Sequence, residues 1–416
     1  MVEFPKCEKD KKMEDQELVD KIVKGEVKFH DVEKHVDARK ATELRRRALE
    51  VLIGKKLQNI GVFSIDIKRA MKANIENFIG VAQVPMGIAG PVQVRGDFAK
   101  GLYPIPLATT EGALVASVNR GCTAINKSSG AISFVMHDGM ARAPVLKAQN
   151  ISHAREALKI IKRSKDKLKE IVESTSRFLK LEEIQTWIIG RNLFVRFVYK
   201  TGDAMGMNMT TIATDKAIKF LEVESGLKSV ALSGNICVDK KSSSLNLLLG
   251  RGKTVISEVV LTRKVIKDVL KTSPKVMADI VYRKCLIGSA LASSYGFNAQ
   301  FANVIAAVFI ATGQDAAHVV EGSQGFTTAE LTDEGDLLFS VTIPSLLVGT
   351  VGGGTALGTQ KEALEIIGVH GAGEPPGSNA SKFAEIVGAA VLAGEISLIG
   401  ALGAKHLAEA HVKLNR

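Results

Sequence analysis

The 416-residue sequence is poor in aromatic residues and in cysteine. Aromatic side chains make up only 5% of it, and no basic run is interleaved with them as single-strand nucleic-acid binders require. Its four cysteines contain no CxxC pair, which excludes a zinc finger or disulfide framework and is typical of reduced thiols in a cytosolic protein. They are Cys7, Cys122, Cys237 and Cys285. No run of about 18 apolar residues occurs, so no membrane-spanning helix is expected, and the mixed-charge N-terminus is unlike a signal peptide.

The remaining composition is that of an ordinary globular protein with a surplus of basic charge. Hydrophobic residues make up 46% and charged residues 24% of the chain, enough to bury a sizeable core in two or three domains. The net charge of +11 would suit nucleic acid, an anionic membrane surface or a polyanionic small molecule. However, the basic runs 21–28, 39–47 and 159–169 carry apolar residues at helical spacing, which favours solvated helix faces.

The chain changes character near Glu76. Residues 1–75 are rich in charge and nearly free of glycine, and their periodicity predicts a small helical domain. The next segment, ENFIGVAQVPMGIAGPVQV, has the glycines and prolines of loops and strands. Residues 109–130 then predict a helix with one closely packed face of small residues.

A second module is expected inside the larger part. Residues 151–180 predict one long amphipathic helix, and residues 186–200 predict a hairpin with its turn at Gly190–Asn192. A further helix and strand follow, an order that favours an inserted split β-α-β module of the ferredoxin-like kind. Residues 281–320 are apolar and rich in alanine, which predicts a long helix buried on most sides.

The expected fold class is therefore α+β, with a small helical N-terminal domain, a large helix-centred domain and an inserted ferredoxin-like domain. The expected boundaries are 1–75 for the helical domain, 76–142 and 243–416 for the large domain, 143–232 for the insert and 233–242 for a connecting loop.

Two motifs carry glycine or methionine in unusual density. VGGGTALGTQ (351–360) predicts a strand-to-helix turn whose exposed amides would suit a phosphate or a dinucleotide. It fits neither the Rossmann nor the Walker pattern, so a plain tight turn is an equally good interpretation. Met205, Met207 and Met209 alternate, and at strand spacing they would share one face, where core filling is the default.

Ionisable residues occur in surroundings that disfavour charge. Glu111 lies in TTEGALVAS and Asp315 in IATGQDAAHV, both short of polar neighbours, while Lys240 and Lys241 are expected to end a strand. A carboxylate in apolar surroundings is costly unless it is paired or used. Each residue alone could be a structural ion pair, but together they indicate a catalytic site.

The sequence gives little support for metal or serine-hydrolase chemistry. His406 and His411 are five residues apart, whereas zinc-binding helices space their ligands three or four apart. No other Cys/His or Glu-rich cluster supports a metal, so none is expected. No G-x-S-x-G elbow occurs, so a serine triad is not expected.

Six motifs together resemble those of one enzyme family, and they occur in that family's order. They are ENFIGVAQVPMGIAGP, TTEGALVASVNRGC, GDAMGMNM, SGNICVDKK, GQDAAHVVEGS and TVGGGT. The sequence is similar, from about Glu76 to Arg416, to the catalytic portion of the 3-hydroxy-3-methylglutaryl-CoA (HMG-CoA) reductases. The DKK motif and the extension through His411 resemble the eukaryotic and archaeal class, without the membrane anchor of animal members.

The resemblance implies reduction of (S)-HMG-CoA to (R)-mevalonate and CoA in isoprenoid biosynthesis, by two hydride transfers from NADPH through a mevaldyl-CoA hemithioacetal. Glu111 would then donate a proton to the reacting carbonyl oxygen, which requires a pKa raised by burial. Lys240 would stabilise the developing oxyanion, Asp315 would couple the two, and His411 would protonate the departing CoA thiolate.

The resemblance also implies binding residues for both ligands. For HMG-CoA these are Arg142, Ser233, Lys241 and Asn303 at the acyl end and Ser117, Asn119, Arg120 and Lys284 along CoA. For the cofactor they are Ser176, Arg177, Asp203, Met205, Met207, Asn208, Gly352, Gly353, Gly354, Asn415 and Arg416. An arginine suits a 2′-phosphate, so NADPH is expected rather than NADH.

The family further implies a cytoplasmic homodimer, possibly a tetramer, with active sites between subunits. The expected division places the lysine segment on one subunit and Glu111 with Asp315 on the other, and His411 on a C-terminal flap that closes over the thioester. Two alternatives remain open, namely another oxidoreductase or CoA-dependent enzyme on the same scaffold, and a basic nucleic-acid-binding protein whose binding would fall steeply with salt.

Overall fold

The computed structural model describes residues 14–404 and divides the chain into two compact units, with the division between Val84 and Pro85. The first unit contains the helices expected for residues 1–75, broken into shorter pieces. They are α1 (Asp15–Val23), the 3-10 helix η1 (Phe29–Lys34), α2 (Ala38–Ile53) and α3 (Ile67–Ala73).

Helix α2 shows why the charge-rich N-terminal sequence folds into helices. Asp37 caps the helix by accepting bonds from the N–H groups of Arg39 and Lys40, and Gly54 ends it in the left-handed conformation. Leu44 on its apolar face packs with Leu18 of α1 in a small core. Arg39 is exposed on the outside of this core, but Arg45 is completely buried and paired with Glu33, so the prediction of a solvated face is wrong for Arg45.

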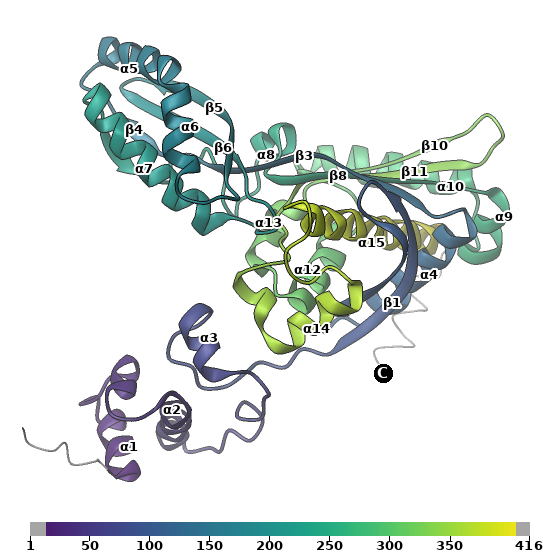
Figure 1. Ribbon diagram of the computed structural model, residues 1–416. Helices are drawn as coiled ribbons and strands as arrows, with labels where there is room; N and C mark the ends of the chain where they lie inside the picture. The colour runs from purple at the N-terminus through teal and green to yellow at the C-terminus, as the bar shows by residue number, and fades with distance from the viewer. Residues whose placement is uncertain (1–13, 405–416) are drawn as a thin grey trace, which may run out of the picture. The chain divides into compact units, whose positions relative to one another are not determined.

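The second unit is built around a mixed sheet and one buried helix. The strands that carry the unit's main core are β1 (Met86–Gly96), β2 (Lys100–Ala108), β3 (Ala131–Arg142), β8 (Gly252–Leu261), β9 (Gly296–Phe297), β10 (Gly325–Leu331) and β11 (Leu337–Leu346). Figure 1 shows α15 (Ser378–Gly403) lying against β3, β8 and β11. The α+β class expected from the sequence is confirmed.

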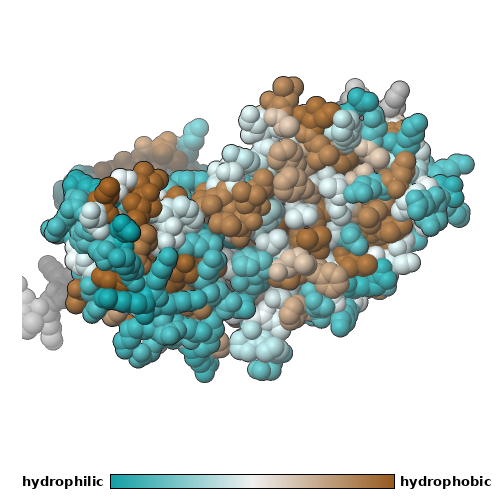
Figure 2. Space-filling model, turned by 90° about the horizontal axis from the view of Figure 1, so that it is seen from above, coloured by the Kyte–Doolittle hydropathy of each residue, from teal (hydrophilic) through white to brown (hydrophobic). Residues whose placement is uncertain are grey.

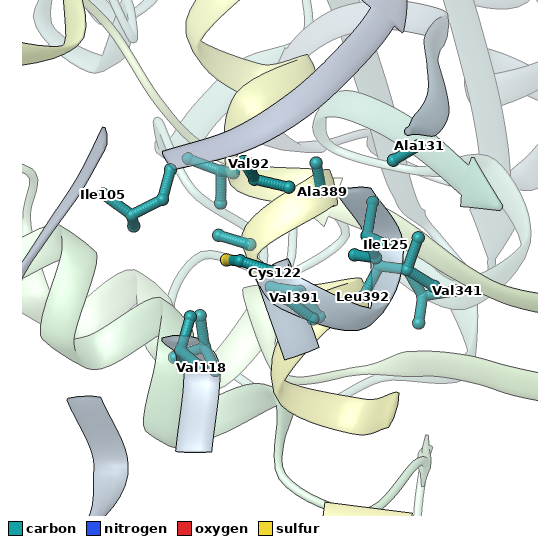
Figure 3. Close-up of a cluster of buried hydrophobic side chains, with 14 of the residues drawn as sticks. Val92, Ile105, Val118, Cys122, Ile125, Ala131, Val341, Ala389, Val391 and Leu392 are labelled. Atoms are coloured by element: carbon teal, nitrogen blue, oxygen red, sulfur yellow. The ribbon is translucent and has the colours of Figure 1, made fainter. Parts of the chain in front are cut away.

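Small residues allow α15 to pack closely on all sides. A side chain at Gly121 of α4 (Leu114–Lys127) would meet the carbonyl of Ala393 at 1.9 Å, and one at Gly388 would meet Ser257 at 2.4 Å. Figure 3 shows the α4–α15 contact between the strands. Its labelled members are Val92, Ile105, Val118, Cys122, Ile125, Ala131, Val341, Ala389, Val391 and Leu392. Helix α15 is long and apolar enough to cross a membrane, but it is almost wholly buried, as a core helix is.

Between β3 and β8 the chain forms a second layered module with its own core. Its elements are β4 (Val145–Lys147), α5 (Ile151–Arg163), α6 (Lys165–Glu173), β5 (Lys180–Ile189), β6 (Asn192–Lys200), α7 (Met207–Ser225) and β7 (Lys228–Ala231). The strands lie in the order β7-β4-β6-β5, with antiparallel pairing throughout. The hairpin predicted at 186–200 is confirmed, and its turn at Gly190 has a φ of 57°.

Two long helices predicted from composition are broken in the structure. The prediction for 151–180 is wrong because the helix is interrupted at Ser164 and ends at Glu173, after which the chain turns into β5. The prediction for 281–320 is wrong because buried Glu395 of α15 accepts bonds from the N–H groups of Ala299 and Gln300, which holds that segment out of a helix.

The remaining elements of the second unit are short. They are α8 (Ser244–Leu249), α9 (Arg263–Val265), the π-helices η2 (Ile266–Leu270) and η3 (Val281–Gly288), α10 (Pro274–Ile280), α11 (Ser289–Leu291), α12 (Phe301–Thr312), η4 (Ala316–His318), α13 (Val319–Gly322), η5 (Gly353–Ala356) and α14 (Gly358–Ile367). Helix α12 is the buried apolar piece of the 281–320 segment; Asn303 lies in its first turn and Asp315 follows its end.

Candidate active site

Lys240 lies in an irregular loop, residues 232–243, that joins β7 to α8. The prediction that it ends a strand is wrong, because β7 already ends at Ala231. Three non-glycine residues of the loop have positive φ: Asn235 (64°), Val238 (49°) and Lys240 (55°). Each such conformation costs on the order of 1–3 kcal/mol and persists only when the surroundings enforce it.

Hydrogen bonds to neighbouring elements enforce this loop conformation. The Gly234 N–H donates to the carbonyl of Ala143 at 2.6 Å, directly after β3. The Asn246 amide donates to the carbonyl of Val238 at 3.2 Å, and the Lys240 N–H donates to a carboxylate oxygen of Glu321 at 2.8 Å. The loop is therefore held from three sides.

The Lys240 ammonium forms an ion pair with Asp315, with Nζ 2.8 Å from Oδ2. The hydrogen bond that the ammonium donates to Asp315 raises the pKa of Lys240. Burial alone would raise the pKa of Asp315, but the bonds from Lys240 and the Ala317 N–H outweigh it and lower that pKa. The side chains are 42% and 37% exposed, so the pair is charged and still open to a ligand.

Asp315 owes its place to the end of α12. The helix ends at Gly313, which has a left-handed φ of 71°, and Asp315 then caps η4 through the N–H of Ala317. The helix end at Gly313 and the cap at Asp315 together place this charged residue outside the apolar helix.

Glu111 lies at the opposite end of α12. Its Oε1 accepts a bond from the Asn303 amide at 3.3 Å, and its side chain is exposed in the single chain rather than buried as expected. Asn303 is in the first turn of α12 and Asp315 lies just beyond its last, so the helix separates them by about 14 Å at 1.5 Å per residue.

Of the expected catalytic residues that the structure describes, Lys240 and Asp315 therefore come together, while Glu111 lies at the other end of α12. The chain thus has two half-sites, a lysine–aspartate pair and a glutamate–asparagine pair. The expected division, with the lysine apart from both carboxylates, is wrong for Asp315, which pairs with Lys240 in the same chain. His411 lies outside the described residues, as do Asn415 and Arg416.

Of the residues expected to bind the acyl carboxylate, Ser233 and Lys241 lie in the lysine loop, and Arg142 is near it. Arg142 ends β3, one residue before the Ala143 carbonyl that binds the loop, and its Nε is buried without a hydrogen-bond partner. The Ser233 hydroxyl lies 3.2 Å from the Cys237 sulfur. The Lys241 ammonium donates to the backbone carbonyl of Asp239 at 3.0 Å, so it has no carboxylate partner in the described structure.

The residues expected along CoA form a separate group on α4 and its neighbours. Ser117 and Arg120 both bond to Ser397 of α15, Arg120 through its Nε at 3.0 Å and through Nη2 to the backbone carbonyl at 2.8 Å. The Asn119 side chain accepts from the N–H of Gly90 at 3.1 Å. Lys284 is exposed on η3.

The expected cofactor residues come together from two segments far apart in the sequence. Ala204 and Val351 form a parallel β-bridge, and the Thr350 N–H donates to the carbonyl of Asp203 at 2.8 Å. Gly352 and Gly353 have φ of 79° and 54°, and the space that a side chain would take at either is open. The turn thus presents bare backbone to solvent, which suits the close approach of a phosphate-bearing ligand.

Asp203 is committed to the protein backbone. Its carboxylate accepts bonds from the N–H groups of Gly373, Gly377 and Ala380 at 2.8–2.9 Å, and it is nearly buried. This arrangement holds the loop that leads into α15. Asp203 therefore shapes the segment beside the glycine turn.

The methionines do not alternate on a strand, since Met207 begins α7. The Met207 sulfur accepts a bond from Arg251 at 2.8 Å, and Met209 packs on the core of the inserted module. Asn208, in the first turn of α7, is exposed. The strand interpretation failed because Gly206, at a φ of 96°, turns the chain into a helix between the methionines.

Arg177 is exposed, with its guanidinium 4.6 Å from the centre of the Phe178 ring. The Ser176 hydroxyl accepts a bond from the N–H of Phe178 at 3.3 Å. A side chain at Gly202 would lie 3.7 Å from Phe178, so these residues neighbour the segment that contains Asp203. An arginine stacked on a ring, with no carboxylate partner in the described part of the chain, is available to an anion.

The glycine turn and the Lys240–Asp315 pair are neighbours. A side chain at Gly313 would meet the backbone of Gly354 at 2.4 Å, and the Gln314 side chain accepts a bond from the N–H of Gly349 at 2.9 Å. Asp315 is the next residue. A ligand seated on the turn would therefore lie beside a charged lysine–aspartate pair, a geometry suited to reducing a polarised carbonyl.

Sequence reasoning missed the residues beneath this pair. Arg251, His318 and Glu321 are completely buried, and Glu321 lies in the quoted motif GQDAAHVVEGS without having been singled out. The signal that was available is the charge itself, since buried ionisable residues in an apolar helical run need partners. Their partners are up to 81 residues away.

Comparisons with known proteins agree on one family. A family model described as hydroxymethylglutaryl-coenzyme A reductase matches residues 41–416. The 3-hydroxy-3-methylglutaryl-coenzyme A reductase of Pyrococcus horikoshii is 54% identical over 405 residues, 96% of this chain and 98% of the relative. That of Methanocaldococcus jannaschii is 52% identical, over 96% of this chain and 99% of the relative.

More distant proteins extend the match. The 3-hydroxy-3-methylglutaryl-coenzyme A reductase 1 of Dictyostelium discoideum is 42% identical, over 98% of this chain and 74% of the relative. The solved structure of the class II enzyme from Streptococcus pneumoniae bound to NADPH has a TM-score of 0.66 over 90% of this chain and all of that chain. At 19% identity, this last similarity speaks for the fold alone.

Proposed function

The chain belongs to the hydroxymethylglutaryl-coenzyme A reductase family, and we propose that it reduces HMG-CoA to mevalonate and CoA with NADPH at the site just described. The observation that carries the proposal is the contact between the glycine turn and the segment of Asp315. It brings the expected cofactor subsite against the charged Lys240–Asp315 pair. When bound, NADPH would supply hydride to the acyl carbon in each of two reductions.

Lys240 is the proposed oxyanion partner in both reductions. Its ammonium is charged at neutral pH, since its pKa is raised by Asp315, and it is exposed enough to reach a substrate oxygen. A preorganised cation aimed at a developing oxyanion is typically worth a factor of about 100–1,000 in rate. Asp315 would hold the ammonium in place between the two steps.

Glu111 and His411 are the proposed proton donors. Glu111, held by Asn303, would protonate the reacting oxygen, and exclusion of water by bound substrate would favour its protonated form. His411, on a proposed C-terminal flap, would protonate the CoA thiolate as the hemithioacetal collapses. The acyl carboxylate would meet the free Nε of Arg142 together with Ser233 and Lys241.

We propose that the two half-sites meet in a homodimer, with Glu111 and Asn303 from one subunit and Lys240 and Asp315 from the other. The separation along α12 supports this division. Exposed apolar side chains, among them Tyr282, Ile287 and Leu291, offer surface for a partner. Figure 2 shows several apolar patches, with polar residues between them, on the face in view.

We also propose that the inserted module, 143–232, is a ferredoxin-like NADP-binding domain within a large HMG-CoA-binding domain. Its strand order supports this assignment, and so does the β-bridge from its Ala204 to Val351 beside the glycine turn. The archaeal relatives and the DKK motif support the eukaryotic and archaeal class, and we propose a cytoplasmic location.

The direct test is a purified-protein assay that follows NADPH consumption with HMG-CoA and measures mevalonate and CoA as products. We expect two NADPH consumed per CoA released, and much weaker activity with NADH. Arg177→Ala should narrow the preference for NADPH, because it removes the exposed guanidinium proposed to meet the 2′-phosphate. Absence of turnover with either cofactor would overturn the proposed function.

A further inference from the structure

A buried ionic cluster lies directly beneath the Lys240–Asp315 pair, and no step proposed above uses it. Glu321 on α13, His318 on η4 and Arg251 at the start of β8 are all completely buried. The Arg251 Nη1 lies 2.7 Å from Glu321 Oε1, and the His318 Nδ1 lies 3.2 Å from Glu321 Oε2. Such groups are expensive to bury, so their retention needs a reason.

The cluster touches the catalytic pair at two points. Glu321 Oε1 accepts the backbone N–H of Lys240 at 2.8 Å, at a residue whose φ of 55° requires enforcement. On the other side, the His318 Nε2 faces Asp315 Oδ2 at 3.7 Å and has no hydrogen-bond partner, although it is buried. One carboxylate thus connects the backbone of the lysine with the element that holds its counter-ion.

Arg251 supplies the positive charge of this cluster. Asp239, His318 and Glu321 could by spacing alone hold a metal ion, with ligand atoms within 4.8 Å of one another. However, the guanidinium already lies 3.1 Å from Asp239 and 2.7 Å from Glu321. Arg251 therefore balances both carboxylates and keeps Glu321 able to accept the bond from Lys240.

We propose that Glu321 is the positioning residue of Lys240, holding the lysine loop in its strained conformation from within the core. The proposal rests on the proposed function for its kinetic consequence, but the geometry on which it stands does not. The charged groups that face Lys240 are Asp315, Asp239 and Glu321, each of which favours the ammonium. Removing the Glu321 charge should therefore lower the pKa of Lys240.

The charge is tested by Glu321→Gln, with Glu385→Gln as its matched control. Glu385 is also a completely buried glutamate, but it accepts the N–H groups of Asp97, Phe98 and Ala99, far along the sheet. Nuclear magnetic resonance of lysine labelled at Cε, with Lys240→Arg to assign the signal, measures the pKa without any turnover. We expect it to fall in Glu321→Gln and to be unchanged in Glu385→Gln.

Kinetics of the same two variants provide a second readout. The alkaline limb of the kcat profile reports loss of the Lys240 ammonium, so it should move to lower pH in Glu321→Gln alone. An unchanged Lys240 pKa in a folded Glu321→Gln would overturn the proposal. Failure of the wild type to reduce HMG-CoA would instead overturn the proposed function, and the resonance experiment would still decide the positioning role.

The bond between Glu321 and the Lys240 backbone is tested by the double variant Arg251→Met/Glu321→Met. This variant is needed because Glu321→Gln leaves the Arg251 charge buried without its Glu321 partner and can fail to fold. Replacing both members of a buried ion pair with apolar residues of similar size often preserves stability. We expect a folded protein whose kcat is roughly 100-fold lower, the scale of a catalytic group misplaced by about 1 Å. A wild-type kcat in the folded double variant would overturn the proposal.

Discussion

The two half-sites are held in very different ways. Lys240 lies on a strained loop bonded to Ala143, Asn246 and the buried Glu321, and its ammonium is paired with Asp315. Glu111 is exposed, and within residues 14–404 its carboxylate has a single bond, of 3.3 Å, to Asn303. The loop that carries the Lys240 charge is held from the core of the protein. Glu111, the proposed proton donor, is instead open to a ligand or a partner subunit.

The largest expected effect is on the lysine–aspartate half-site, the more tightly held of the two. Lys240→Ala should lower kcat by about 1,000-fold, the upper range for removing one oxyanion partner. The thermal midpoint should change little because the side chain is partly exposed. Steady-state kinetics together with a melting curve measure both. Retention of more than a tenth of the wild-type rate would remove Lys240 from the mechanism.

The separation of the halves is tested by mixing two inactive proteins. If each site takes Glu111 from one subunit and Lys240 from the other, a heterodimer of Glu111→Gln and Lys240→Ala has one intact site. After random exchange of subunits, activity should rise from the background to roughly a quarter of the wild type, because half the dimers are mixed. No recovery, with exchange verified by differently tagged chains, would place a complete site within one chain.

A smaller effect is expected on stability as pH changes. Asp315 has its pKa lowered from 3.8, so its contribution is present above that pH and is lost as pH falls through the folded value. Lys240 has its pKa raised from 10.5, so its contribution is present below that pH and is lost as pH rises through the folded value.

Asp315→Asn should remove both the acid and the alkaline part of this pH dependence of stability. The difference in melting temperature between wild type and variant should be largest near neutral pH and shrink toward both extremes. For a pair this exposed, the difference should correspond to no more than about 1 kcal/mol. A difference independent of pH would show that the ion pair contributes nothing to stability.

The smallest effect is expected at the glycine turn. Gly352 has a φ of 79° and a ψ of 173°, a region open essentially to glycine alone. Gly352→Ala should raise the KM for NADPH a few-fold and leave that for HMG-CoA unchanged. Gly358→Ala is the control, because Gly358 also borders open space but has no positive φ. Equal effects of the two substitutions would argue against a role for the turn's conformation.

Sequence could predict what depends on local pattern. The α+β class and the hairpin around Gly190 followed from periodicity and turn residues. Charge in apolar surroundings singled out Lys240 and Asp315 as site residues, but their pairing within one chain was not predicted. The break in residues 281–320 could not be predicted, because it depends on Glu395, about a hundred residues later. Glu321 was missed for the same reason.

The contact between Gly313 and Gly354 has a consequence for how the site can vary. Two turns from distant parts of the chain meet here backbone to backbone, with no side chain between them. The distance from a ligand on the glycine turn to the Asp315 carboxylate is therefore set by direct backbone contact between the two glycines. A methyl group at either position would push the two turns apart and would increase that distance. The spacing of this active site therefore depends on glycine at both positions.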